Sequence, residues 1–171
     1  MSKIKHLSSL QNPLVKKILL LKEKSRERKK EALFVAEGQR ELELAALGGL
    51  TITSILFEPS LCSKETVLEK YNTVKELISV RKEVYQKLAY RGTTEGIIGL
   101  IESKKHALDS LKFKNKNPLI LIAEAPEKPG NIGALLRTAD AANLDAVLIA
   151  NPKTDLYNPN IIRSSVGCVF T

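Results

Sequence analysis

The sequence predicts an α/β protein, in which strands and helices alternate along most of the 171 residues. Three observations support this prediction: several apolar runs have the length of buried strands, the segments between them have helical spacing, and Pro, Gly and Asn mark the boundaries. The hydrophobic content of 43% is enough to bury one core or two small ones. We expect a small N-terminal α/β domain followed by part of a second one.

Positive charge is concentrated at the start of the chain. Residues 1–30 hold ten Lys and Arg against two Glu, so this segment accounts for the whole formal net charge of +8. Asn12-Pro13 predicts the start of a helix that is apolar at its beginning and basic at its end. A basic arm of this kind is typical either of an RNA-binding surface or of a solvated helix face. The candidate RNA-binding residues in it are Lys22, Lys24, Arg26, Arg28, Lys29 and Lys30.

A small α/β domain is expected over residues 31–102. The alternation of predicted elements indicates a parallel or mixed sheet covered by helices. Arg91 lies in a polar loop between a predicted helix and a predicted strand, and is a candidate for substrate contact. The predicted strands are 33–36, 52–57, 74–80 and 96–101, and the predicted helices are 39–47, 63–71 and 81–90.

The polar, lysine-bearing residues 103–117 are expected to be a linker, with a short helix around 107–111. The α/β order then continues with a predicted strand at 119–123, a helix at 131–142 and a strand at 146–150. Asn131 is expected to cap that helix, and Asn143 to end it in a left-handed conformation. We expect a short helical or irregular segment at 157–165 and the start of another strand at 166–170.

The most informative stretch is Pro129-Gly130-Asn131-Ile132-Gly133-Ala134-Leu135-Leu136-Arg137-Thr138-Ala139. Its spacing alone favours a well-capped strand–loop–helix unit, in which Gly133 lets another group approach closely. The stretch also resembles the first signature of the SpoU/TrmH-type RNA 2′-O-ribose methyltransferases of the SPOUT superfamily. A later segment is similar to the family pattern N-P-x-x-x-R-x-S-x-G, namely Asn158-Pro159-Asn160-Ile161-Ile162-Arg163-Ser164-Ser165-Val166-Gly167.

Shorter landmarks of the same family occur nearer the N-terminus. Residues 9–16 resemble the leader of a bacterial and mitochondrial branch, and Phe34-x-x-Glu37-Gly38 is similar to a landmark of its substrate-binding domain. The resemblance implies that residues 31–102 bind the RNA substrate and that residues 118–171 are an incomplete SPOUT methyltransferase domain of the α/β-knot type. Lys128 and Asn143 depart from the residues that the family usually has at these positions.

The resemblance implies S-adenosylmethionine-dependent methylation of a ribose 2′-hydroxyl in rRNA or tRNA. Arg137 and Asn131 are the expected catalytic residues. A guanidinium stays protonated above pH 12, so we expect Arg137 to stabilise the developing charge on the hydroxyl electrostatically. Asn131 would contact the adjoining phosphate or the arginine. Backbone amides near Gly133 are expected to receive an anion, and Arg163 to bind a further phosphate.

The later signatures of the family, which form a trefoil knot around S-adenosylmethionine, are not found before Thr171. We therefore expect the cofactor-binding residues to lie beyond Thr171, this chain alone to be inactive, and a homodimer only when the knot domain is complete. Apolar residues near the end of the chain would then be uncovered, namely Ile161, Ile162, Val169 and Phe170. A non-catalytic RNA-binding module is the alternative, because the N-terminal part has all its expected elements.

The remaining features exclude other classes of site. The two cysteines and the two histidines have no metal-type or redox spacing, so we expect no metal site and no disulfide. The glycine patterns of dinucleotide-binding and P-loop proteins do not occur. Without a signal peptide or an apolar run of membrane-spanning length, we expect a cytoplasmic protein with no membrane partner.

Overall fold

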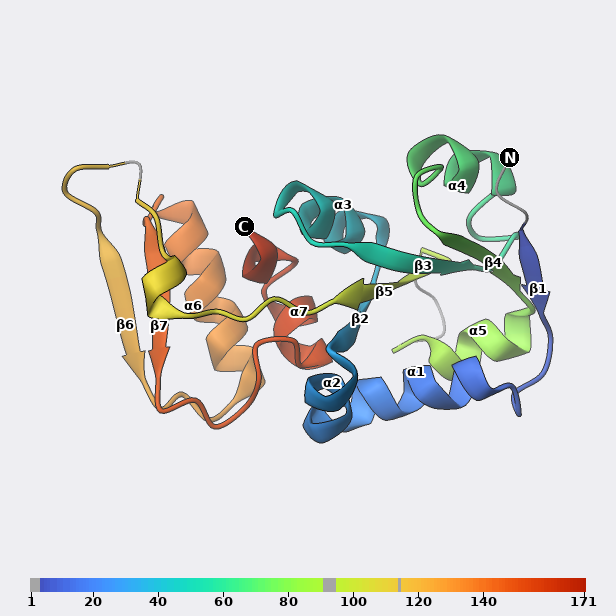
Figure 1. Ribbon diagram of the computed structural model, residues 1–171, viewed down its shortest axis with the longest axis horizontal. Helices are drawn as coiled ribbons and strands as arrows, with labels where there is room; N and C mark the ends of the chain where they lie inside the picture. Colours follow the sequence, from blue (N-terminus) through green and yellow to red (C-terminus); the bar gives the residue numbers. More distant parts are fainter. Residues whose placement is uncertain (1–3, 91–94, 114) are drawn as a thin grey trace.

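The computed structural model describes residues 4–90, 95–113 and 115–171, and its α/β architecture confirms the predicted fold class (Figure 1). A five-stranded sheet has the order β1-β4-β3-β5-β2, and a separate two-stranded sheet pairs β6 with β7. The strands are β1 Lys5–Leu7, β2 Leu33–Glu37, β3 Ile52–Phe57, β4 Glu76–Val80, β5 Ile97–Glu102, β6 Ile120–Glu124 and β7 Ala146–Ala150. The helices are α1 Pro13–Glu23, α2 Ser25–Glu31, α3 Gln39–Leu47, α4 Lys64–Lys70, α5 Lys82–Leu88, α6 Pro129–Ala141 and α7 Pro159–Ser164, with 3₁₀ turns η1 Leu108–Ser110 and η2 Cys168–Phe170.

The five-stranded sheet is mixed. Strands β1, β4 and β3 run parallel to one another, whereas β5 pairs antiparallel with both β3 and β2. Side chains alternate between the two faces of each strand, so Ile97 and Ile101 of β5 join one buried cluster while Ile98 and Leu100 join the other. Helices α1 and α5 contribute buried side chains to the second cluster, and α3 and α4 to the first. The sheet is therefore covered on both faces.

The first thirty residues differ from the expected separate arm, because they are built into this sheet and its helical layer. β1 pairs with the edge strand β4, and α1 buries Val15, Ile18 and Leu21 against the sheet. Asn12 caps α1 as the sequence indicated, with its side-chain oxygen accepting from Leu14 N–H at 2.8 Å. The single expected helix is broken at Lys24, whose extended backbone separates α1 from α2.

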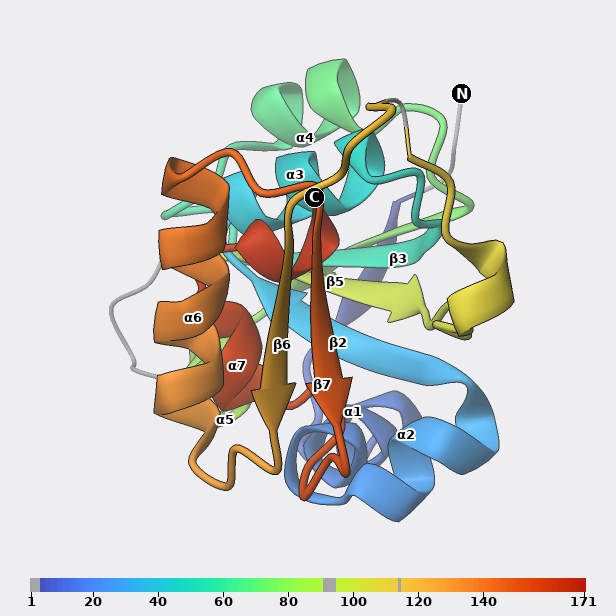
Figure 2. The same ribbon diagram turned by 90° about the vertical axis from the view of Figure 1, so that its left-hand side faces the viewer.

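The second sheet pairs β6 with β7 in parallel, and α6 lies alongside both strands (Figure 2). Helix α6 starts at Pro129 with Lys128 as its cap, so the prediction that Asn131 caps it was wrong. Proline is well suited to the first helical position, because its ring fixes a helical φ where no N–H partner is required. The predicted left-handed end of the helix is confirmed, since Asn143 has a φ of 52°.

The end of the chain packs into the core of the N-terminal sheet. The Tyr157 ring stacks on Phe34 with centroids 4.2 Å apart, and the Phe170 ring lies 5.7 Å from the same phenylalanine. Ile161 and Ile162 are also buried, and Val169 is partly buried against the same cluster. The expectation that residues Ile161, Ile162, Val169 and Phe170 would be uncovered was therefore wrong.

The strand expected at residues 166–170 is also absent from the structure. Val166 and Gly167 have positive φ angles of 54° and 85°, which turn the chain instead of extending it. The 3₁₀ turn η2 follows and directs the Phe170 ring into the core. The burial of this aromatic ring explains why the last residues turn back towards the sheet and do not continue as a strand.

Candidate functional site

Helices α6 and α7 carry the two signature segments and pack directly against each other. Gly133 is the contact point: a Cβ added there would lie 2.0 Å from Ser164 Oγ and 2.7 Å from the Ser164 carbonyl carbon. Ser164 Oγ in turn donates to the Asn160 carbonyl oxygen at 2.6 Å. The structure thus confirms the close approach predicted at Gly133. The prediction that backbone amides near Gly133 receive an anion is corrected, because Ser164 covers Gly133 and buries it.

Arg137 lies one turn after Gly133 and therefore on the same side of α6. Its guanidinium donates a hydrogen bond to the carbonyl oxygen of Ser164, at the C-terminal end of α7. The residue is nevertheless exposed, so its remaining N–H donors are available at the surface. Arg137 is thus an anchored cation that can still reach a ligand.

Asn131 is exposed in the first turn of α6. It precedes Arg137 by six positions, which places the two side chains about 120° apart around the helix axis. Within the described part of the chain, the Asn131 amide has no hydrogen-bond partner. The structure therefore brings Arg137 to α7 but leaves Asn131 on a neighbouring face of α6.

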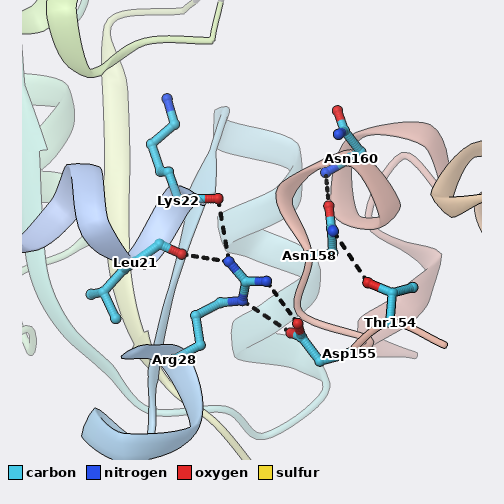
Figure 3. A network of polar contacts seen from close by, with 7 residues as sticks. All are labelled: Leu21, Lys22, Arg28, Thr154, Asp155, Asn158 and Asn160. Atoms are coloured by element: carbon cyan, nitrogen blue, oxygen red, sulfur yellow. Dashed lines mark hydrogen bonds and ion pairs between the residues drawn. The ribbon is translucent and has the colours of Figure 1, made fainter. Parts of the chain in front are cut away.

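The start of α7 is fixed by the Asn-Pro-Asn segment (Figure 3). Asn158 caps the helix, with its side-chain oxygen accepting from Asn160 N–H at 2.9 Å. Its amide group donates to Thr154 Oγ1 at 3.2 Å. Pro159 then occupies the first helical turn, where it needs no N–H partner. These contacts explain why the motif has Asn and Pro in this order.

Arg28 ties this segment to the N-terminal helices (Figure 3). Its Nε and Nη2 donate to the two carboxylate oxygens of Asp155 at 3.0 and 2.7 Å, and its Nη1 donates to the carbonyl oxygens of Leu21 and Lys22. The side chain is only 4% exposed. Arg28 was predicted to bind RNA, and this prediction is corrected because its guanidinium is buried in contacts within the protein. Nothing in the sequence around Arg28 signals this burial, because its ion-pair partner Asp155 lies far along the chain.

Asp155 is ionised in this arrangement. Burial raises the pKa of its carboxyl group, but hydrogen bonds from Arg28 and Ser25 and the positive charge of Arg28 outweigh that effect. The net result is a pKa below the usual value for aspartate. The pair is therefore a charged one, with two parallel N–H···O contacts.

The other predicted basic residues of α2 and its start remain at the surface. We call Lys24, Arg26, Lys29 and Lys30 the basic surface, because all four are exposed. Arg26 and Lys30 lie 3.7 and 4.0 Å from the carboxylate of Glu27, whereas Lys24 and Lys29 form no ion pair with any described residue. These two lysines are therefore the most available for a polyanion.

Tyr90 joins α1 to α7, a role that sequence analysis missed because this residue only marked the end of a predicted helix. The Arg163 guanidinium lies 4.8 Å from the Tyr90 ring centroid, and the Lys22 ammonium lies 5.9 Å from it. The Tyr90 hydroxyl donates to the Asn160 side-chain oxygen at 2.7 Å. Lys22 is partly buried and also donates to the Leu88 carbonyl oxygen; burial lowers its pKa, although Glu37 acts in the opposite direction. The candidate Arg91 lies outside the described residues.

Beside Tyr90 lies a cavity of about 260 Å³, which we call the junction cavity. It is bounded by the N-terminal domain on one side and by α7 on the other. Its lining residues are Lys22, Val35, Glu37, Gly38, Glu41, Tyr90, Glu95, Pro159, Ile162 and Arg163.

The described residues offer no metal site, since none of their His, Cys, Asp and Glu side chains gather in groups of three or more that could hold an ion. A cofactor of an open parallel sheet would bind beyond the carboxyl ends of β6 and β7. There the Asn151 amide donates to Glu124 at 2.7 Å, and the side chains of β7 are only half-buried. The described residues at this edge therefore leave these side chains partly exposed to solvent. No helix among them has the length and apolarity to span a membrane.

Comparison with known protein families accounts for both parts of the chain. Residues 12–99, just over half of it, match the MRM3-like substrate binding domain, and residues 118–171 match the SpoU rRNA Methylase family. The chain belongs to the SpoU family, with an MRM3-like substrate-binding domain. The first match begins at residue 12, in keeping with the packing of α1 against the N-terminal sheet.

Solved structures and curated relatives agree with this membership. A crystal structure of an RNA 2′-O ribose methyltransferase is 36% identical, with a TM-score of 0.81 over 97% of this chain and 63% of its own. The 23S rRNA (guanosine(2553)-2′-O)-methyltransferase of Bacillus subtilis is 26% identical over 98% of this chain and 63% of its own length. Human mitochondrial rRNA methyltransferase 3 is 28% identical over 84% of this chain and 34% of its own length. This SpoU-family chain thus spans between a third and just under two thirds of these curated relatives.

We predict that Gly133→Ala destabilises the protein, although alanine favours helices more than glycine does. The new methyl group would collide with Ser164, so the free energy of unfolding should fall by about 1–3 kcal/mol. Gly130→Ala is the matched control, because nothing lies within 4 Å of a Cβ at that position of the same helix. It should leave stability unchanged or raise it by up to about 1 kcal/mol. Urea denaturation compares the two, and equal stabilities would contradict the proposed α6–α7 contact.

Proposed function

We propose that this chain takes part in the S-adenosylmethionine-dependent methylation of ribose 2′-hydroxyl groups in ribosomal RNA. The observation that carries the proposal is the anchoring of Arg137 against Ser164, which joins the two signature segments at an exposed cation. Membership of the SpoU family supports it, as do relatives named as 2′-O-methyltransferases of 23S rRNA. The alternative of a non-catalytic RNA-binding module is not favoured by these relatives.

The proposed role of Arg137 is electrostatic. A ribose hydroxyl must lose its proton when it becomes a nucleophile, and a fixed cation stabilises the negative charge that develops on its oxygen. One donor of Arg137 is held by Ser164, which restricts the guanidinium while other donors remain available. S-adenosylmethionine, when bound, supplies an activated methyl group; the residues described here orient the acceptor. Asn131, on the neighbouring face, would contact an adjoining phosphate.

The basic surface is the proposed contact for the RNA backbone. Among the described residues Lys24 and Lys29 have no carboxylate partner, so phosphate groups can bind them without breaking an ion pair there. Arg163 would contribute a further contact near α7. We propose the cytoplasm as the compartment, and a homodimer through the complete methyltransferase domain as the assembly. Leu119, just before β6, and Ile122, within it, are exposed and are consistent with an apolar surface that a further chain segment or subunit covers.

Replacing Arg137 with Ala should lower methyl transfer by about a hundredfold or more, as for the loss of one preorganised donor. The assay requires a form of the protein extended to the full length of its relatives, with labelled S-adenosylmethionine and ribosomal RNA. Affinity for the cofactor should stay nearly unchanged, because Arg137 is assigned to the acceptor. The matched control is Arg40→Ala on α3, which should retain activity. Turnover of Arg137→Ala close to that of the unmodified protein would contradict the proposed site.

The double substitution Lys24→Ala and Lys29→Ala should flatten the salt dependence of RNA binding. Each lost phosphate contact removes about 0.7–0.9 from the slope of log K against log salt, so the expected decrease is about 1.4–1.8. Point substitutions are preferable to deletion of residues 1–30, because deletion would remove strand β1 from the sheet and the helix α1 that packs on it. The control is Lys64→Ala with Lys82→Ala, two exposed lysines of α4 and α5. An unchanged slope in the first variant would exclude the basic surface from the RNA contact.

A further inference from the structure

We propose that the junction cavity binds one base of the RNA, from a nucleotide close in the strand to the one that is methylated. This inference rests on the proposed function, and it adds a site that reads a base. The cavity is suited to this role because a stacking surface, apolar walls and hydrogen-bond acceptors converge on it from both domains.

The stacking surface is assembled before any ligand arrives. Tyr90 is fixed at both ends, since its backbone N–H donates to Glu37 at 2.8 Å and its hydroxyl donates to Asn160 at 2.7 Å. The Arg163 guanidinium lies over the ring, with its central carbon 4.8 Å from the ring centroid. Aromatic rings and guanidinium planes are the surfaces on which proteins stack unpaired RNA bases. Because Tyr90 is already held in place, binding of a base costs little further conformational entropy.

The size of the cavity fits a single ring system. Its volume of about 260 Å³ is just below the range of about 300–1,000 Å³ typical of small-molecule sites. Val35 of β2 and Ile162 of α7 are both buried and supply the apolar part of the lining. A base can therefore enter while its sugar and phosphate remain outside, near Lys22 and Arg163.

The carboxylates that line the cavity determine which ligands it can bind. The three carboxylates of Glu37, Glu41 and Glu95 outnumber the two cations of the lining, Lys22 and Arg163, so a phosphate group inside the cavity is disfavoured. Burial raises the pKa of Glu41, and the neighbouring charges of Glu95 and Glu37 raise it further. A ligand that offers N–H donors relieves this unfavourable environment. Bases with an exocyclic amino group, namely guanine, adenine and cytosine, should therefore be preferred to uracil.

The position of the cavity relative to Arg137 follows from α7. Pro159, Ile162 and Arg163 line the cavity, whereas Ser164 faces α6 and accepts the hydrogen bond from Arg137. The two sites lie on opposite sides of one short helix, and a helix with its side chains is about 10–12 Å across. A single strand passing over α7 can therefore place one base in the cavity and a nearby ribose at Arg137.

The test measures binding of the 171-residue chain to a labelled 12-nucleotide single-stranded RNA by fluorescence anisotropy. Tyr90→Ala should weaken binding about tenfold, within the range known for one stacked base, and leave the salt slope unchanged. Tyr90→Phe keeps the ring and should bind within about twofold of the unmodified chain. Lys64→Ala, on the distant helix α4, should bind like the unmodified chain.

A second series makes each nucleotide of that RNA abasic in turn. One position should cost the unmodified chain about tenfold in affinity and cost Tyr90→Ala nothing further, because the same contact is already lost. At that position the unmodified chain should prefer cytosine to uracil, and Glu41→Gln should reduce this preference.

Normal RNA affinity in Tyr90→Ala, or no position sensitive to base removal, would overturn the cavity site and leave the proposed function intact. A chain that binds no RNA at all would overturn both proposals.

Discussion

The packing of the segment from Asp155 to Phe170 against the N-terminal sheet is the interaction on which the rest of the structure depends. Tyr157, Ile162 and Phe170 complete the same apolar cluster as Phe34, so the sheet and the methylase segment share one core. The buried ion pair of Arg28 with Asp155 closes one edge of this contact. Removal of either partner would leave a buried charge unpaired, which is costly and makes the relative placement of the two parts specific.

This shared core gives α7 its functional position. The helix has only six residues, and its placement is determined by its neighbours more than by its own hydrogen bonds. One side of it packs on Gly133 and receives Arg137; the other closes the junction cavity beside Tyr90. The N-terminal domain therefore helps to build the proposed catalytic surface, in addition to its proposed contact with RNA. Changes in the contact between Phe34 and Tyr157 would therefore alter both the Arg137 contact and the junction cavity.

Local patterns in the sequence were sufficient for most elements. The predicted bounds of α3, β3 and β7 agree with the structure, because Gly48-Gly49 ends α3 and apolar runs of strand length define the two strands. Burial by distant partners was harder to predict. Arg28 was assigned to RNA because a basic residue in a basic run carries no sign of its partner 127 positions away. The turn at Val166 was missed for the same reason, since it depends on the burial of Phe170 against Phe34.

Native-state hydrogen exchange across a series of urea concentrations tests the shared core most directly. The Ser165 amide, which donates to the Ile161 carbonyl oxygen at 2.8 Å, and the amide of Ala36 in β2, which pairs with Gly99 of β5, are suitable probes. If the two parts form one cooperative core, both amides should exchange through the same global opening, with equal free energies and equal urea dependence. A Ser165 amide that exchanges several kcal/mol more easily than that of Ala36, with little dependence on urea, would contradict the shared core.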